Sequence, residues 1–139
     1  METMTQEDKD LLLKDLCARL PYDVKVNCND KVYNFAGIHS FNICILSDDN
    51  ADNAFTTAGI KYIKPYLFPL SSITIEQERE LSKLGVSYGE YALHDDIRGL
   101  GIMVDEAYIF FKFCYNHHID FLGLIEMGLA IDATGKNIY

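Results

Sequence analysis

The chain has 139 residues, a length typical of one domain, and 49% of them are hydrophobic, enough for a core without metals or disulfides. Its 21 acidic residues outnumber the 12 basic ones and give a formal net charge of −9. This excess of acid argues against nonspecific binding to nucleic acid or anionic membranes, since both need an excess of Lys and Arg. The composition also excludes collagen, coiled coil and intrinsic disorder.

The amino-terminal residues lack the pattern of a secretory signal, because a polar start is followed by charged residues at 7–10. No apolar run is long enough to predict a membrane span. None of the cysteines forms a C-x-x-C pair that would indicate zinc or a redox motif. We therefore expect a cytoplasmic protein whose cysteines are buried free thiols. These are Cys17, Cys28, Cys44 and Cys114.

The first part of the chain predicts a helix followed by antiparallel strands. Thr5 is a candidate N-cap, apolar residues recur at helical spacing after it, and Pro21 ends the helix near Arg19 or Leu20. Strands are then predicted over residues 23–28, 31–38 and 41–46, with a hairpin turn at Asn29-Asp30. Their close spacing favours a meander, because parallel neighbours need long crossovers.

The middle of the chain is less regular. Residues 47–59 are small, polar and acidic, and we expect a loop there. Residues 60–64 predict a short strand. Residues 65–69 contain two prolines, each of which removes a hydrogen-bond donor, so we expect an extended segment crossing an edge of the core.

Helices and two further strands are predicted for the rest. Thr74 and Gln77 form a capping box at the start of a helix over 75–84. Asp105 and Asp120 are candidate N-caps of two later helices. The remaining predictions are strands at 88–93 and 98–103, helices at 106–117 and 121–127, a turn at 132–135 and a terminal residue pair, 138–139, docked on the body.

Helices and strands in this order are segregated rather than alternating, which predicts an α+β fold. We expect one domain over residues 1–139, with an N-terminal helix, an antiparallel meander, a later hairpin, and helices packed on one side.

Histidines and carboxylates supply the candidate catalytic or metal-ligating groups. His117 and His118 are followed by an aspartate, but adjacent helical residues point about 100° apart, and histidine is common at helix ends. His94 and Asp95 stand in a predicted turn, where Asp is frequent. Together these four residues would form a metal or acid/base site only if the fold brought them into proximity.

Other motifs of chemistry are weak or missing. Residues 48–52 have the opening spacing of a calcium loop, but Asn53 and Gly59 replace the expected Gly and Glu. The phosphate-binding glycine motifs and the G-x-S-x-G nucleophile elbow are absent from the sequence. We therefore expect no cofactor and identify no catalytic nucleophile.

Tyrosine and phenylalanine are abundant, with nine and eight residues, and they cluster in the middle of the chain. Tyrosine is enriched at binding surfaces, although aromatic residues also form cores. Basic residues stand among these rings and could line a ligand pocket. The candidate ligand-binding residues are Lys61, Lys64, Tyr66 and Arg98.

Three segments of the chain are distinctive: DLLLKDLCARLPY at 10–22, KPYLFPLSS at 64–72, and residues 120–139. They resemble a family of small uncharacterised acidic proteins of anaerobic gut bacteria and their phages and mobile elements. The resemblance implies a cytoplasmic protein of a kind that phages also carry, and it carries over no catalytic residue. Small acidic phage proteins often bind and block a host component.

These observations favour a non-catalytic binding protein, such as an antagonist of host defence. It would block a host protein through an acidic surface that imitates nucleic acid, or sequester a nucleotide-like signal. The alternatives are a small metal-dependent or acid/base enzyme, and an interaction module of a mobile element. A homodimer is a reasonable expectation for a small bacterial domain.

Overall fold

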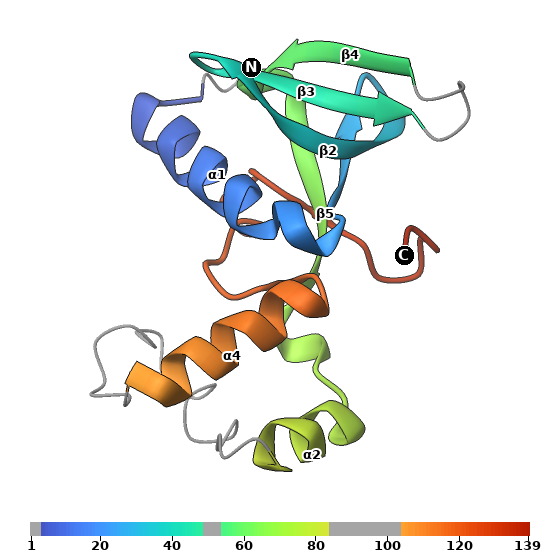
Figure 1. The fold of residues 1–139 in the computed structure, drawn as a ribbon. Coiled ribbons are helices and arrows are strands. Elements are labelled where there is room, and N and C mark those ends of the chain that lie inside the picture. Colours follow the sequence, from blue (N-terminus) through green and yellow to red (C-terminus); the bar gives the residue numbers. More distant parts are fainter. Residues whose placement is uncertain (1–3, 49–53, 84–103) are drawn as a thin grey trace.

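The computed structural model describes residues 4–48, 54–83 and 104–139, with side chains from residue 108 onward in the last range. The chain forms helices and a mixed sheet, so the predicted α+β class is confirmed. Figure 1 shows helix α1 beside the curved sheet, and α2 and α4 beyond it at the far end of β5. The strands predicted at 88–93 and 98–103 lie outside the described residues.

Helix α1 spans Gln6–Arg19 and begins as predicted, because Thr5 and Asp8 form a capping box. Leu12 and Leu16 are fully buried against the sheet. The buried face also includes Asp15 and Arg19, whereas Cys17 is exposed. The expectation that all four cysteines are buried is therefore wrong for Cys17, which lies outside the i, i+3, i+4, i+7 face of the helix.

Four antiparallel strands form the meander, one more than predicted. Asn29 and Asp30 connect the first two strands with positive φ angles of 53° and 62°, the geometry of a tight hairpin turn. The loop expected over residues 47–59 is wrong for residues 47–48, which end one strand, and for Ala54–Gly59, which pairs with that strand along its whole length. Residues 49–53 lie outside the described residues. The strands are β1 (Lys25–Cys28), β2 (Lys31–Ser40), β3 (Ile43–Asp48) and β4 (Ala54–Gly59).

Strand β5 (Ile63–Pro69) lies inside the sheet, whose order is β4-β3-β2-β1-β5-β6. The expected edge-crossing segment is therefore wrong. Its prolines are accommodated because β5 changes neighbours: Pro65 is the last residue paired with β1, and Pro69 is the last residue of the strand. The strand predicted at 60–64 begins late, because Ile60–Tyr62 forms a 3₁₀ helix.

The end of β5 leads into a smaller helical part. After a 3₁₀ turn at Leu70–Ser72, α2 (Ile75–Lys83) begins at the predicted capping box between Thr74 and Gln77. Helix α4 (Val104–Asn116) includes Asp105, so the helix begins earlier than this predicted cap. A second core contains Leu81, Phe110, Phe113, Cys114 and Ile119.

The chain returns to β5 through two short parallel strands, β6 (Ile119–Asp120) and β7 (Ile131–Asp132). The helix predicted at 121–127 is wrong: this segment consists of bends and turns. Asp120 still acts as a cap, because its carboxylate accepts hydrogen bonds from the backbone N–H groups of Leu124 and Ile125. The turn predicted at 132–135 is confirmed by the Thr134 N–H bond to the Asp132 carboxylate.

Arg19 joins the two parts of the molecule. Its side chain is fully buried, its Nε lies 2.8 Å from Asp15 Oδ2, and its Nη2 donates to the Ile119 carbonyl at 2.7 Å. The guanidinium also lies 5.2 Å and 5.8 Å from the ring centroids of Tyr115 and Phe121. The last turn of α1 is thereby attached to the junction between α4 and β6.

The buried pair is incompletely satisfied. Among the described residues, Arg19 Nη1 and Asp15 Oδ1 have no hydrogen-bond partner. Burial raises the pKa of the Asp15 carboxyl, and the neighbouring guanidinium only partly opposes this effect. A charge left alone at this position would be strongly unfavourable.

We expect Arg19→Ala to lower the free energy of unfolding by about 3–5 kcal/mol, because it leaves a buried carboxylate without its cation. The double variant Asp15→Leu/Arg19→Met should recover most of that loss, because apolar residues of similar volume replace the whole pair. Urea denaturation of the three proteins measures both effects. A loss below about 1 kcal/mol in the single variant would contradict the assigned role.

Candidate functional site

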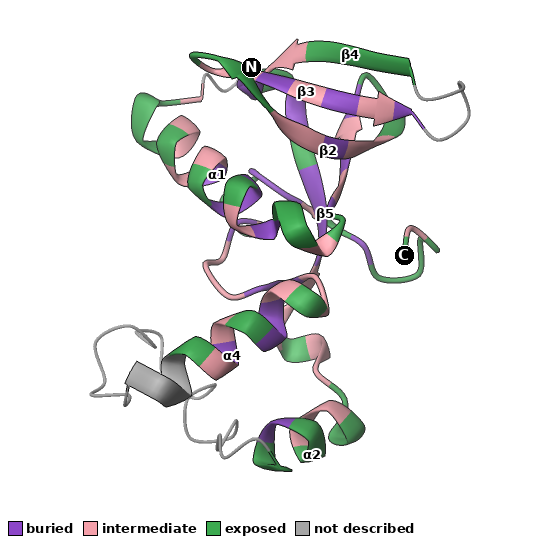
Figure 2. Ribbon diagram, in the orientation of Figure 1, coloured by how far each residue is buried: buried purple, intermediate pink, exposed green. Residues whose placement is uncertain are grey.

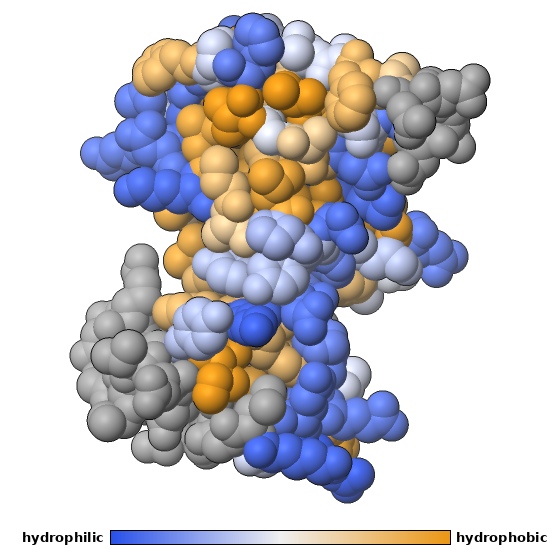
Figure 3. All heavy atoms as spheres, in the orientation of Figure 1, coloured by the Kyte–Doolittle hydropathy of each residue, from blue (hydrophilic) through white to orange (hydrophobic). Residues whose placement is uncertain are grey.

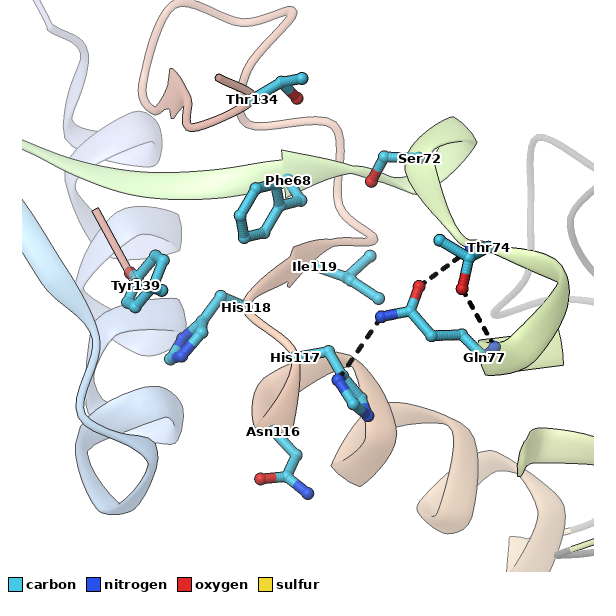
Figure 4. Close-up of a pocket in the computed structure, with 10 residues that line it drawn as sticks. All are labelled: Phe68, Ser72, Thr74, Gln77, Asn116, His117, His118, Ile119, Thr134 and Tyr139. Atoms are coloured by element: carbon cyan, nitrogen blue, oxygen red, sulfur yellow. Dashed lines mark hydrogen bonds between the residues drawn. The ribbon is translucent and has the colours of Figure 1, made fainter. Parts of the chain in front are cut away.

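A cavity of about 460 Å³ lies where β5 ends and the helical part begins. This volume is within the range of small-molecule sites. Figure 4 shows residues of β5, α2, the end of α4 and the carboxyl-terminal segment around it. The described lining residues are Phe68, Ser72, Thr74, Gln77, Asn116, His117, His118, Ile119, Thr134 and Tyr139.

One wall is a hydrogen-bonded chain that starts at the cap of α2. Thr74 and Gln77 bond each other reciprocally, which fixes the Gln77 side chain. Its Nε2 lies 3.5 Å from His117 Nδ1, and His117 Nε2 lies 3.1 Å from Glu80 Oε2. In the neutral ring, this arrangement favours the proton on Nε2, facing Glu80. The His117 ring also packs on Phe113, with centroids 4.4 Å apart.

His118 forms the opposite wall with Tyr139. Its backbone has a φ of +57°, which turns the chain out of α4 and into β6. The imidazole stacks on the Tyr139 ring with centroids 3.6 Å apart and an interplanar angle of 10°. Burial, aided by the charge of Arg19, lowers the pKa of His118 to about 4. The ring is therefore neutral near pH 7.

Tyr139 holds this wall against the sheet. Its hydroxyl donates to the Tyr66 carbonyl at 2.7 Å and accepts from the Lys25 backbone N–H at 2.9 Å. Burial raises the pKa of this phenol to about 12. The prediction that the terminal residues dock on the body is confirmed for Tyr139.

The lining of the cavity combines apolar surface with hydrogen-bonding side chains. Phe68 and Ile119 provide apolar surface, while amides, imidazoles and hydroxyls supply hydrogen-bonding groups. No Lys, Arg, Asp or Glu belongs to its described lining. Ser72 Oγ donates to the Pro69 carbonyl and Thr74 Oγ1 accepts from Gln77, so neither hydroxyl faces a base that would activate it.

The fold brings His117 and His118 to one cavity, but their rings have different neighbours: His117 contacts Glu80, and His118 stacks on Tyr139. This agrees with the expectation that adjacent residues point in different directions. Both follow the last residue of α4 rather than lying within its final turn. The described residues contain no group of three His, Cys, Asp or Glu side chains arranged to hold a metal. His94 and Asp95 lie outside the described residues.

The predicted ligand-binding set is placed elsewhere. Lys64 and Tyr66 share one face of β5, but Tyr66 is buried and its hydroxyl accepts a bond from Asn27 Nδ2. Lys61 is exposed, with its ammonium 5.0 Å from the Tyr62 ring centroid. These three residues are not part of the cavity's described lining, and Arg98 lies outside the described residues.

Sequence reasoning missed Gln77 and Glu80 as neighbours of His117. The capping box placed Gln77 correctly, and Glu80 follows three residues later on the same side of α2. The contact itself depends on how α2 packs against α4, and no local pattern encodes that geometry.

Comparison with protein-family models, with curated proteins and with solved structures finds no match for this chain. Within the described part of the chain, no helix combines the length and apolarity needed to cross a membrane.

We expect His118 to make the protein less stable in mild acid. The pKa of His118 is about 4 in the folded state and about 6.5 when unfolded, so the unfolded chain binds the extra proton first. The stability that depends on a neutral His118 is therefore fully present above pH 6.5 and is lost as the pH falls toward 4.

Urea unfolding from pH 7.5 to 4 measures this effect, with His118→Asn as the matched variant, because Asn tolerates the positive φ. The wild type should lose more stability than the variant over this range. Parallel pH profiles would contradict the assignment.

Proposed function

We propose that this protein is a non-catalytic binding protein that holds a small, uncharged, planar molecule in the cavity. The supporting observation is the combination of apolar surface, the stacked His118–Tyr139 pair and neutral polar groups around one space. A planar heterocycle would gain stacking and hydrogen bonds there without requiring a buried counter-charge.

This chemistry favours ligand sequestration over the blocking of a host protein. A nucleotide signal would bind with its base stacked in the cavity. Its phosphate would need a cation from outside the described lining, and Lys64 stands four residues before Phe68 on β5, about 13 Å away along the strand. A free nucleobase or nucleoside therefore fits the proposal better than a nucleotide.

The setting is proposed from the sequence. The resemblance to small proteins of gut bacteria and their phages supports an antagonist that removes a host signal from the cytoplasm. Cys28, Cys44 and Cys114 are buried free thiols, in keeping with a reducing compartment.

The His117–Glu80 pair favours a second candidate, an acid/base enzyme. Of the two ring nitrogens of His117, Nδ1 has the weaker contact, 3.5 Å from Gln77, and Nε2 is held by Glu80. Nδ1 is therefore the nitrogen that could accept a proton from a ligand. Against this, Glu80 does not belong to the cavity lining, and the ring also links α2 to α4. If the protein is an enzyme, Glu80→Gln and His117→Gln should each abolish turnover of any ligand that binds.

Isothermal titration with neutral nucleobases and nucleosides tests the binding proposal. Asn116→Trp adds an exposed aromatic side chain at the cavity lining, so it should weaken binding at least tenfold. Lys136→Trp is the control, since Lys136 is exposed and outside that lining, and its affinity should match the wild type. Binding of no compound, or equal affinity in both variants, would contradict the proposal.

Mass spectrometry of compounds released from denatured protein provides an independent search for the natural ligand. A neutral heterocycle is the expected finding. A released compound that carries several charges would contradict the proposed ligand class.

A further inference from the structure

Strand β4 forms one edge of the sheet (Figure 1). Within the part of the chain that the structure describes, β4 pairs with β3 on one side and with no strand on the other. Figure 2 shows it exposed over most of its length. An edge of this kind presents unpaired backbone donors and acceptors, and proteins usually protect it with lysine, proline or a bulge. The sequence AFTTAG at 54–59 contains no charge and no proline.

The pairing with β3 shows which side chains share a face. Cys44 and Leu46 of β3 are buried in the core, so the alternate residues Ile43, Ile45 and Ser47 lie on the outer face. Directly opposite these residues, in the same order, are Gly59, Thr57 and Phe55. Phe55, Thr57 and Gly59 therefore lie on the outer face of the sheet.

The two ends of β4 differ on this face. At one end the Phe55 side chain is 66% exposed. At the other end Gly59 has no side chain, and a Cβ placed there would stand 3.6 Å from the Tyr62 ring. Tyr62 is itself 58% exposed. The strand thus carries an exposed ring at one end and, at the other, a residue without a side chain that lies beside the exposed Tyr62 ring.

We propose that a second copy of this chain pairs antiparallel with β4, around a two-fold axis at Thr57. This register places Phe55 of each copy opposite Gly59 of the other, beside Tyr62. It keeps every side chain on its own face, because opposite residues of an antiparallel pair point the same way. The interface is isologous, so the contact between Phe55 of one copy and Gly59 of the other occurs twice.

Two observations favour a second copy of this chain as the partner of β4: the strand is complementary to itself, and it carries no charge. Phe55 and Gly59 lie four residues apart on β4. A two-fold axis midway between them, at Thr57, places each of them opposite the other residue in the second copy. A chain with a net charge of −9 repels its own copies, and the uncharged β4 edge allows two copies to approach closely.

The area available indicates a weak dimer. The exposed parts of Phe55 and Tyr62 from both copies amount to roughly 500 Å², taking about 200 Å² for a whole aromatic side chain. A standard stable interface buries about 1,600 Å². The strand edges add backbone hydrogen bonds, and the dimer should dissociate on dilution and strengthen with salt, which screens the repulsion.

Cysteine cross-linking tests the register in the 139-residue chain, with Cys17→Ser as the background. Two Thr57→Cys residues on the axis would have Cα atoms about 4.5–5.5 Å apart, within disulfide range. Thr57→Cys should therefore give a covalent dimer on mild oxidation. Thr56→Cys is the matched control: it lies on the other face and off the axis, and should stay monomeric. Equal cross-linking of both variants, or of neither, would overturn the proposal.

Light scattering over a concentration series tests association without cross-linking. The mass of the wild type should rise from 15.8 kDa toward twice that value. Phe55→Lys should weaken association at least tenfold, whereas Tyr108→Lys, at a 65% exposed aromatic residue of α4, should leave it unchanged. Circular dichroism checks that both variants are folded. A wild type that stays monomeric at every concentration would overturn the proposal.

Discussion

The guanidinium of Arg19 lies between the two cores of this protein and contacts groups from two segments of the chain, α1 and residues 115–121. It pairs with Asp15 on its own helix, donates to the Ile119 carbonyl of β6, and lies near the rings of Tyr115 and Phe121. The sheet and α1 share one apolar cluster, while α2 and α4 share another. Figure 3 shows apolar residues gathered on the visible face of the sheet part and bordered by hydrophilic ones. A buried cation that joins such clusters adds geometric definition more than net stability, since its desolvation offsets much of the attraction.

The candidate site depends on this junction. Ile119 lines the cavity, and His118 immediately precedes it at the point where the chain turns from α4 into β6. Arg19 therefore positions the backbone that carries one cavity wall. Its charge also acts on the site, because it adds to the burial that lowers the pKa of His118 and keeps this ring neutral. Arg19 thus contributes to the neutrality of one ring of the cavity, after burial, and also links the two cores.

Elements with local signals could be predicted from the sequence, and those that depend on tertiary packing could not. The capping boxes at Thr5 and Thr74 and the turn at Asn29-Asp30 are each encoded within a few residues. Strand β4 was missed because an edge strand that faces solvent has little apolar alternation. Strand β5 was misjudged because its prolines are compatible with a central strand only where the neighbouring strands change. At the site, His117 and His118 stood out by residue type, but the neighbours that define their chemistry come from distant segments. The sequence marked Arg19 only as a residue near the end of a helix, and its burial depends on rings from a distant segment, Tyr115 of α4 and Phe121 after β6.

The most direct test of this account is amide hydrogen exchange in the wild type and in Arg19→Met. The amide of Phe68 bonds the His118 carbonyl, and the amide of Leu124 bonds the Asp120 carboxylate, so both report on the junction. The amides that pair β2 with β3 report on the sheet. If Arg19 holds the junction, the variant loses protection at Phe68 and Leu124 while protection between β2 and β3 is retained. Unchanged protection at Phe68 and Leu124, or an equal loss throughout the sheet, would contradict the central role assigned to Arg19.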